Sequence, residues 1–173
     1  MNSLIGGTPA PTFDDPLEML LACHGRIQAQ CGTLHKLLAH LPPHGCDTQA
    51  QQAARAILRY FDTAGRHHHD DEEQDLFPLL RATGDSAAQQ LIARLLGEHQ
   101  IMDAAWRQLR CYLTGLAHGT SAALDTATAE HFIAVYDRHI ALENSQLLPL
   151  AKQLLTAAQL QTLGKNMATR RMN

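Results

Sequence analysis

Two segments of the chain each place a glutamate four positions after a histidine and then reach a proline. The first pair is His68 and Glu72, and the second is His139 and Glu143. Residues four apart on an α-helix lie on one face, one turn from each other. Imidazole and carboxylate groups together bind iron, manganese or zinc. Two such pairs in one small chain therefore predict a dinuclear metal site inside a helix bundle.

The first segment also offers neighbouring side chains, because His67, His69 and Glu73 flank the pair. Aligning the two segments on the proline that ends each of them selects His68 and Glu72. The helical phase of the apolar residues upstream selects the same two positions. We therefore expect His67 and His69 to point outward or to stand behind the ligands. The alternative is that this polar run is simply the solvated face of a helix.

Four long amphipathic helices are expected to position these side chains. Apolar residues recur at three- and four-residue spacing over residues 15–41, 48–81, 86–117 and 121–150. A shorter helix is expected over 156–170, and no alternation typical of strands competes with this pattern. Short turns between long helices predict an all-α fold, an antiparallel up-down-up-down four-helix bundle with a short C-terminal fifth helix.

Glycine and proline mark the expected boundaries. Residues 1–14 are rich in both and predict a flexible N-terminal arm before a bundle domain over 15–173. The first helix is expected to end near Leu41, where two prolines follow. Pro78 is expected to kink or end the second helix, since proline lacks the N–H that a helix needs.

Each long segment carries one histidine on its apolar face. In an antiparallel bundle these four histidines fall within about 6 Å of one level along the axis, at about 1.5 Å of rise per residue. One such histidine alone is more often an ordinary core residue, so the prediction rests on all four together. The two glutamates should face the same level, where a buried carboxylate needs a cation. The predicted metal ligands are His24, His68, Glu72, His99, His139 and Glu143.

Composition excludes several other classes of protein. The 173 residues carry a formal net charge of −3, which gives no basic patch for nucleic acid. The four cysteines form no Cys-x-x-Cys pair, so thiolate metal sites have no support. No signal-peptide pattern and no membrane-spanning apolar run stand out. We therefore expect a cytoplasmic protein with no membrane or nucleic-acid partner, as a monomer or homodimer.

The doubled motif ends in Leu-Phe-Pro or Leu-Leu-Pro, and further helix-borne histidines stand in the segments Cys23–Ile27 and Gly97–Gln100. On these motifs, over about residues 15–165, the chain resembles the hemerythrin-like HHE cation-binding family. The resemblance implies a non-heme centre of two iron ions with an oxo or hydroxo bridge. The four histidines become its terminal ligands, the two glutamates become its bridges, and one position stays open for a small ligand. Zinc and manganese are the alternative metals.

One position departs from the hemerythrins that carry oxygen. In those proteins a second histidine follows one turn after the histidine that matches His99. The matching position of this chain is Asp103. Asp103 is therefore either a metal ligand, a hydrogen-bond acceptor or a solvated residue. Glu98 and Gln28 are candidates for hydrogen bonds to the ligands.

Three functions are consistent with these residues. The first is a di-iron protein that binds or senses dioxygen, nitric oxide or peroxide, in iron–sulfur cluster repair or a stress response, as the resemblance implies. The second is an iron storage or delivery protein. The third is a non-catalytic interaction bundle that contains zinc. Whether the protein turns over a substrate is left open by the sequence, although no serine-hydrolase or phosphate-loop signature is present.

Overall fold

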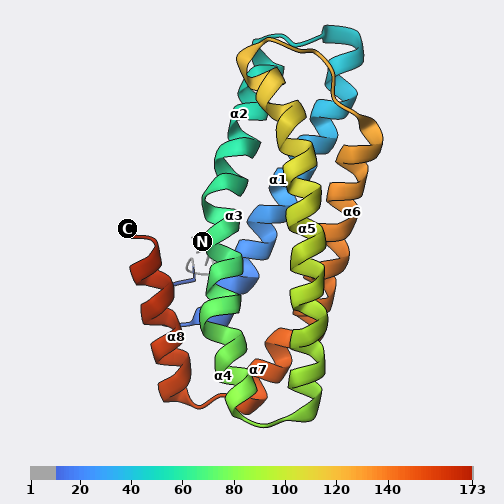
Figure 1. Ribbon diagram of the computed structural model, residues 1–173. Coiled ribbons are helices and arrows are strands. Elements are labelled where there is room, and N and C mark those ends of the chain that lie inside the picture. Colours follow the sequence, from blue (N-terminus) through green and yellow to red (C-terminus); the bar gives the residue numbers. More distant parts are fainter. Residues whose placement is uncertain (1–10, 173) are drawn as a thin grey trace, which may run out of the picture.

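The computed structural model describes residues 11–172, and every regular element in that range is helical (Figure 1). The first long segment is α1 (Pro16–His44). The second is formed by α2 (Thr48–Asp62), α3 (Ala64–Asp70), the π-helical turn η1 (Asp71–Leu76) and α4 (Phe77–Ala82). The third is α5 (Ser86–His118). The fourth is formed by α6 (Thr126–Leu142), the π-helical turn η2 (Glu143–Leu147) and α7 (Leu148–Leu154), and α8 (Ala157–Arg170) follows it.

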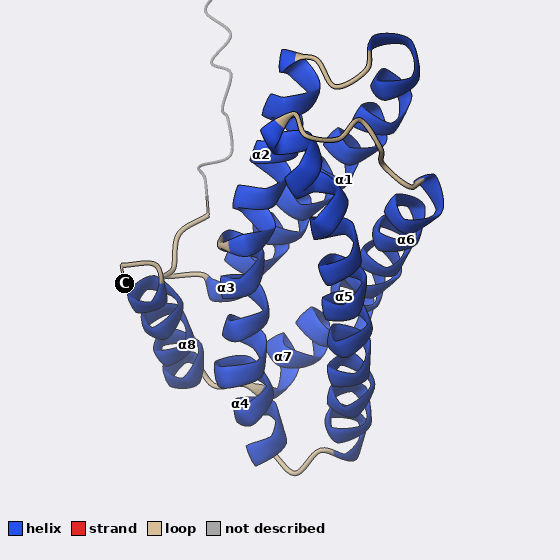
Figure 2. Ribbon diagram, turned by 45° about the horizontal axis from the view of Figure 1, so that its top comes forward, coloured by secondary structure: helices blue, strands red, loops and turns tan. Residues whose placement is uncertain are grey.

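The four long segments form a closed ring of neighbours. Helix α1 contacts α2 and α6, and α5 contacts the same two helices from the other side. The predicted antiparallel four-helix bundle with a short C-terminal helix is thus confirmed. Helix α8 lies outside the ring and packs against α1 and η1 (Figures 1 and 2). Within the described residues, no helix has the length and hydropathy to cross a bilayer.

An aspartate begins each long segment. The carboxylates of Asp15, Asp47, Asp85 and Asp125 each accept a hydrogen bond from the backbone N–H three residues later. Such caps satisfy N–H groups that lack a helical partner and stabilise the start of a helix. The expected start of the fourth helix near residue 121 was therefore wrong, because α6 begins after the cap at Asp125.

The first helix also ends later than expected. It continues through its two prolines to His44 instead of stopping near Leu41. The N–H of Gly45 donates to the Leu41 carbonyl over 2.8 Å and closes the last turn. Gly45 then adopts a φ of +67°, which glycine tolerates and other residues rarely adopt. The glycine, rather than the prolines, is where the chain leaves the helix.

Two π-helical turns accommodate the prolines that follow the glutamates. The N–H of Phe77 donates to the Glu72 carbonyl five residues back, directly before Pro78. The N–H of Leu148 donates to the Glu143 carbonyl in the same way, directly before Pro149. The expected interruption at Pro78 therefore takes the form of a wider turn, after which the helix continues to Ala82. Such turns are rare and occur frequently at functional sites.

The bundle interior divides into two apolar clusters with a polar layer between them. Along α1, Leu17 and Leu20 belong to one cluster, and Ile27 and Leu34 belong to the other. His24 lies between these two sets and is buried. Helix α5 repeats the order, with His99 between residues of the two clusters. The polar layer is thus enclosed from both ends by apolar side chains.

Part of the expected N-terminal arm, residues 1–10, lies outside the described residues. The remainder of residues 1–14 precedes α1, where Phe13 packs against one apolar cluster. The backbone of Phe13 approaches α8 so closely that a Cβ at Gly164 would collide with the Phe13 carbonyl oxygen. Glycine at this position therefore lets α8 pack against the start of the bundle.

Candidate metal centre

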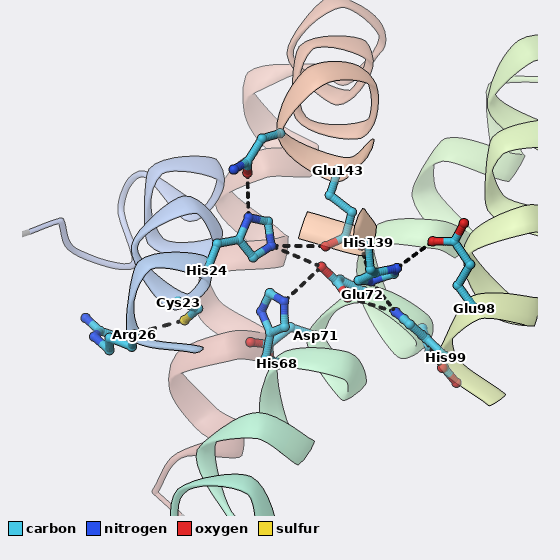
Figure 3. Close-up of polar contacts among 12 residues, drawn as sticks. Cys23, His24, Arg26, His68, Asp71, Glu72, Glu98, His99, His139 and Glu143 are labelled. Atoms are coloured by element: carbon cyan, nitrogen blue, oxygen red, sulfur yellow. Dashed lines mark hydrogen bonds and ion pairs between the residues drawn. The ribbon is translucent and has the colours of Figure 1, made fainter. Parts of the chain in front are cut away.

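The six predicted ligand residues lie together in the polar layer, and all four long segments contribute to the set (Figure 3). All are at most 4% exposed to solvent. Helices α1, α3, α5 and α6 each supply one histidine, and the two π-helical turns supply the glutamates. The residues brought together are His24, His68, Glu72, His99, His139 and Glu143.

The carboxylate of Glu72 presents its two oxygens to opposite sides of the layer. Oε1 lies 3.3 Å from His68 Nε2 and 4.0 Å from His24 Nε2. Oε2 lies 3.4 Å from His99 Nε2. One oxygen therefore faces the imidazoles of α1 and α3, while the other faces an imidazole of α5.

The carboxylate of Glu143 has the same divided arrangement. Its Oε2 lies 3.1 Å from His24 Nε2, and its Oε1 lies 3.1 Å from His139 Nε2. Each glutamate thus contacts one or both of His24 and His68 through one oxygen, and His99 or His139 through the other. This is the arrangement that a carboxylate needs to join two metal ions.

The ligand atoms form two groups of four that share both glutamates. His24 and His68 complete one group, and His99 and His139 complete the other. Within each group the nitrogen and oxygen atoms lie within 4.8 Å of one another. Two cations placed in these groups would lie side by side, each with two imidazoles and a share of two carboxylates.

Hydrogen bonds orient three of the four imidazoles. The Nδ1–H of His99 donates to Glu73 over 2.6 Å, and the Nδ1–H of His139 donates to Glu98 over 2.9 Å. The Nδ1–H of His24 donates to the side-chain oxygen of Asn144 over 2.6 Å. Each bond leaves Nε2 directed into the layer. Metal-binding histidines in proteins are commonly held by such bonds.

The outer hydrogen bonds follow the internal repeat. Glu73 comes directly after Glu72, and Asn144 comes directly after Glu143. Each of these residues bonds a histidine on a neighbouring helix. The sequence predicted this role for Glu98, named Glu73 only as a neighbour that could replace Glu72, and did not single out Asn144. Their equivalent places in the two aligned motifs were the signal that could have identified them.

The polar atoms of the layer are short of hydrogen-bond partners. Both oxygens of Glu72 and of Glu143 are buried without a hydrogen bond, and so is Nε2 of His24. The Nε2 atoms of His99 and His139 face each other over 3.1 Å, although both rings donate through Nδ1. A buried polar group that lacks a partner is costly. Cations in the two groups would satisfy all these atoms, so the residues fit a pair of metal ions.

The pKa shifts in the layer show that it favours positive charge. Burial lowers the pKa of His24 and His99, but the glutamate carboxylates beside their Nε2 atoms outweigh burial and raise the pKa to about 10 and about 9. Burial raises the pKa of Glu72, yet the surrounding imidazoles outweigh it and hold the pKa well below its usual range. The layer therefore holds carboxylates that attract positive charge, either protons or metal ions.

His69 lies behind one of the predicted ligands, His99. Its residue is partly exposed, but its Nε2 is buried, and its ring stacks on His99 with centroids 4.2 Å apart. Its ligand atom forms a further close group with those of His99 and His139. Of the two orientations expected for His69, outward or behind the ligands, the ring adopts the second, against His99 on α5. His68, one residue earlier and about 100° around the helix, faces α1 instead.

The remaining candidates lie outside the layer. Asp103 is exposed, lines a pocket beside the layer and belongs to none of the close ligand groups. Gln28 is exposed on α1. His67, the third histidine of the run, is partly exposed and joins none of the groups found among the described residues.

Comparison with known proteins identifies the family. The model of the hemerythrin HHE cation binding domain matches residues 15–151, which include all six residues of the layer. The chain belongs to this hemerythrin-like family of metal-binding helical bundles. An uncharacterized protein of Haemophilus influenzae is 36% identical over 160 residues, which cover 92% of each chain.

Proposed function

We propose that this protein holds a non-heme di-iron centre and uses it to bind or sense a small oxidant such as dioxygen, nitric oxide or peroxide. The observation that carries the proposal is that each buried glutamate presents one oxygen to each pair of histidines. The ligand set is His24, His68, Glu72, His99, His139 and Glu143. A stress response or the repair of iron–sulfur clusters is the setting that we infer.

The chain's own residues define the conditions at the centre. The apolar clusters on both sides of the layer exclude bulk water. The hydrogen bonds from His24, His99 and His139 keep three Nε2 atoms directed into the layer. A bound iron pair would supply electrons and an open position for a small ligand. Iron binds well to imidazole and carboxylate ligands. Zinc and manganese bind the same ligands.

Spectroscopy of the iron-loaded protein tests this function. Protein loaded with ferrous iron under nitrogen is exposed separately to nitric oxide, hydrogen peroxide, air and azide. We expect at least one of the oxidants to produce new visible absorption bands, and azide to shift the bands of the oxidised form. An iron-loaded protein whose spectrum responds to none of these ligands would contradict the proposal. The Glu72→Ala variant serves as the control that lacks an intact centre.

Iron delivery is the second candidate, and one pocket favours it. A pocket of about 290 Å³ lies between α3, η1 and α5 and reaches His69 and His99. Its walls carry the carboxylates of Asp70, Glu73 and Asp103 against one arginine. An acidic pocket of this kind attracts cations. Rapid transfer of iron from the loaded protein to an apo iron–sulfur protein would favour delivery, whereas retention of both irons would favour the sensing role.

A further inference from the structure

We propose that His69 is a seventh protein ligand of the metal centre and serves the position between His99 and His139. This inference rests on the proposed metal centre. It assigns a direct role to a residue that the doubled motif does not include. The two metal positions then differ, with two imidazoles at one and three at the other.

The position of the His69 ring favours metal binding. Its Nε2 lies in the interior without a hydrogen-bond partner. Its ring stacks on the His99 ring at an interplanar angle of 21°, and its centroid lies 6.2 Å from that of His139. The ligand atoms of the three histidines lie within 4.8 Å of one another. Three imidazoles that converge this closely from α3, α5 and α6 can share one cation.

The buried nitrogen of His69 needs a polar partner. If His69 only packed against His99, its buried nitrogen would remain unpaired, which is unfavourable. A structural histidine would be expected to avoid this cost by bonding a nearby polar group, as His139 does with Glu98. A metal ion in the adjacent group satisfies the His69 nitrogen and removes the cost.

Helices α5 and α3 supply different numbers of imidazoles to the layer. Helix α5 directs only one imidazole into the layer, that of His99, because Asp103 one turn later is exposed. Helix α3 instead places two consecutive histidines against the layer. His68 belongs to the group that includes His24, and His69 belongs to the group that includes His99. The extra ligand at the second position therefore comes from α3.

Two variants of His69 separate ligation from packing. His69→Phe keeps an aromatic ring for the stack on His99 but removes the nitrogen. His69→Ala opens a space beside the pocket that free imidazole can fill. His67→Ala is the matched control, since His67 is the neighbour in the same run and joins none of the close groups. Thermal unfolding of each metal-free variant confirms that it folds.

Metal content and the rate of metal release to a chelator are the measurements. We expect the wild type and His67→Ala to retain two metal ions per chain after gel filtration. Both His69 variants should retain one and release the other at least tenfold faster. Free imidazole should restore the second ion to His69→Ala and have no effect on His67→Ala.

Specific results would overturn the inference. If His69→Phe keeps two ions with wild-type release rates, the ring acts only by packing. If His69→Ala loses an ion that imidazole does not restore, the residue acts on the fold and not on the metal. A wild-type protein that binds no metal would instead refute the proposed centre itself. The two failures are therefore distinguishable.

Discussion

Asp71 and Arg171 form an ion pair that joins the C-terminal helix to the metal layer, with Arg171 Nη2 2.6 Å from Asp71 Oδ2. Asp71 is fully buried and directly precedes Glu72 in η1. Arg170 contacts the other oxygen of Asp71 and also binds Asp75 over 2.6 Å. Helix α8 thus holds the π-helical turn that directs Glu72 into the layer.

Removal of both arginines should destabilise the protein strongly. In the Arg170→Ala/Arg171→Ala variant, Asp71 would be a buried carboxylate without its cationic partners. Breaking a buried ion pair in this way typically costs about 3–5 kcal/mol. We expect a loss of this size in urea unfolding of the metal-free protein, together with weaker metal binding because η1 is no longer held.

The control for this variant is Arg110→Ala. Arg110 pairs with Asp62 over 2.9 Å, but both side chains are substantially exposed. Exposed pairs contribute only about 0–1 kcal/mol. Equal losses of stability in the two variants would show that α8 is not a fixed part of the metal layer.

The residues that follow the two glutamates should tune metal affinity without being ligands. Glu73→Ala removes the acceptor for His99, and Asn144→Ala removes the acceptor for His24. Loss of such a hydrogen bond typically weakens metal binding about 10- to 100-fold. Competition with a chelator measures the affinity. Gln74→Ala is the control, because the Gln74 side chain donates to Asp70 on the exposed surface. An equal effect of this change would contradict the assigned role.

Loss of either bridging candidate should empty at least one metal position. We expect Glu72→Ala and Glu143→Ala each to lose one or both metal ions and to destabilise the metal-loaded bundle, since each removes oxygens from both groups. His67→Ala should retain wild-type metal content. Elemental analysis of the purified variants decides the matter. If His67→Ala empties the site while His68→Ala does not, the helical register is wrong.

The stability of the metal-free protein should depend on pH with a maximum near neutrality. The pKa of His24 and of His99 is raised to about 10 and about 9 in the folded state, so their contribution is full below about pH 6.5 and is lost as pH rises through those values. Burial lowers the pKa of His68 and His69, so the unfolded state gains protons below about pH 6.5 and stability falls there.

Metal should reverse the alkaline part of this profile. Imidazole binds a cation in its neutral form, so metal binding releases protons and strengthens as pH rises. Thermal unfolding from pH 5 to 10, with and without metal, measures both effects. We expect the metal-induced rise in Tm to increase with pH. A rise that is constant over this range would contradict the assignment of His24 and His99 as ligands.

Much of the centre could be predicted from the sequence because it depends on local spacing. The four-residue interval sets His68 with Glu72 and His139 with Glu143 on helix faces, and the apolar periodicity orients those faces. The depth of His24 and His99 along their helices follows from rise per residue. These local rules also account for the bundle topology, since long helices with short turns must pack antiparallel.

Other features depend on contacts that spacing does not reveal. The direction of His69 depends on which helix lies beside α3, and the helical pattern alone left two directions open, outward or behind the ligands. The bond from His24 to Asn144 joins residues from the first and last long segments. The docking of α8 depends on the pairing of Arg171 with Asp71 across the fold. The π-helical turns have a local signal, the proline six positions after Glu72 and Glu143, but the expectation for Pro78 was a kink or an end of the helix and not a wider turn.

The central claim is that two cations share the two buried glutamates. It is tested most directly by loading metal-free protein with ferrous iron under nitrogen, removing unbound iron by gel filtration and measuring iron per chain. The account predicts two irons per chain in the wild type and fewer in Glu72→Ala and Glu143→Ala. A folded wild-type protein that retains no iron, or the same two irons in wild type and both variants, would contradict it.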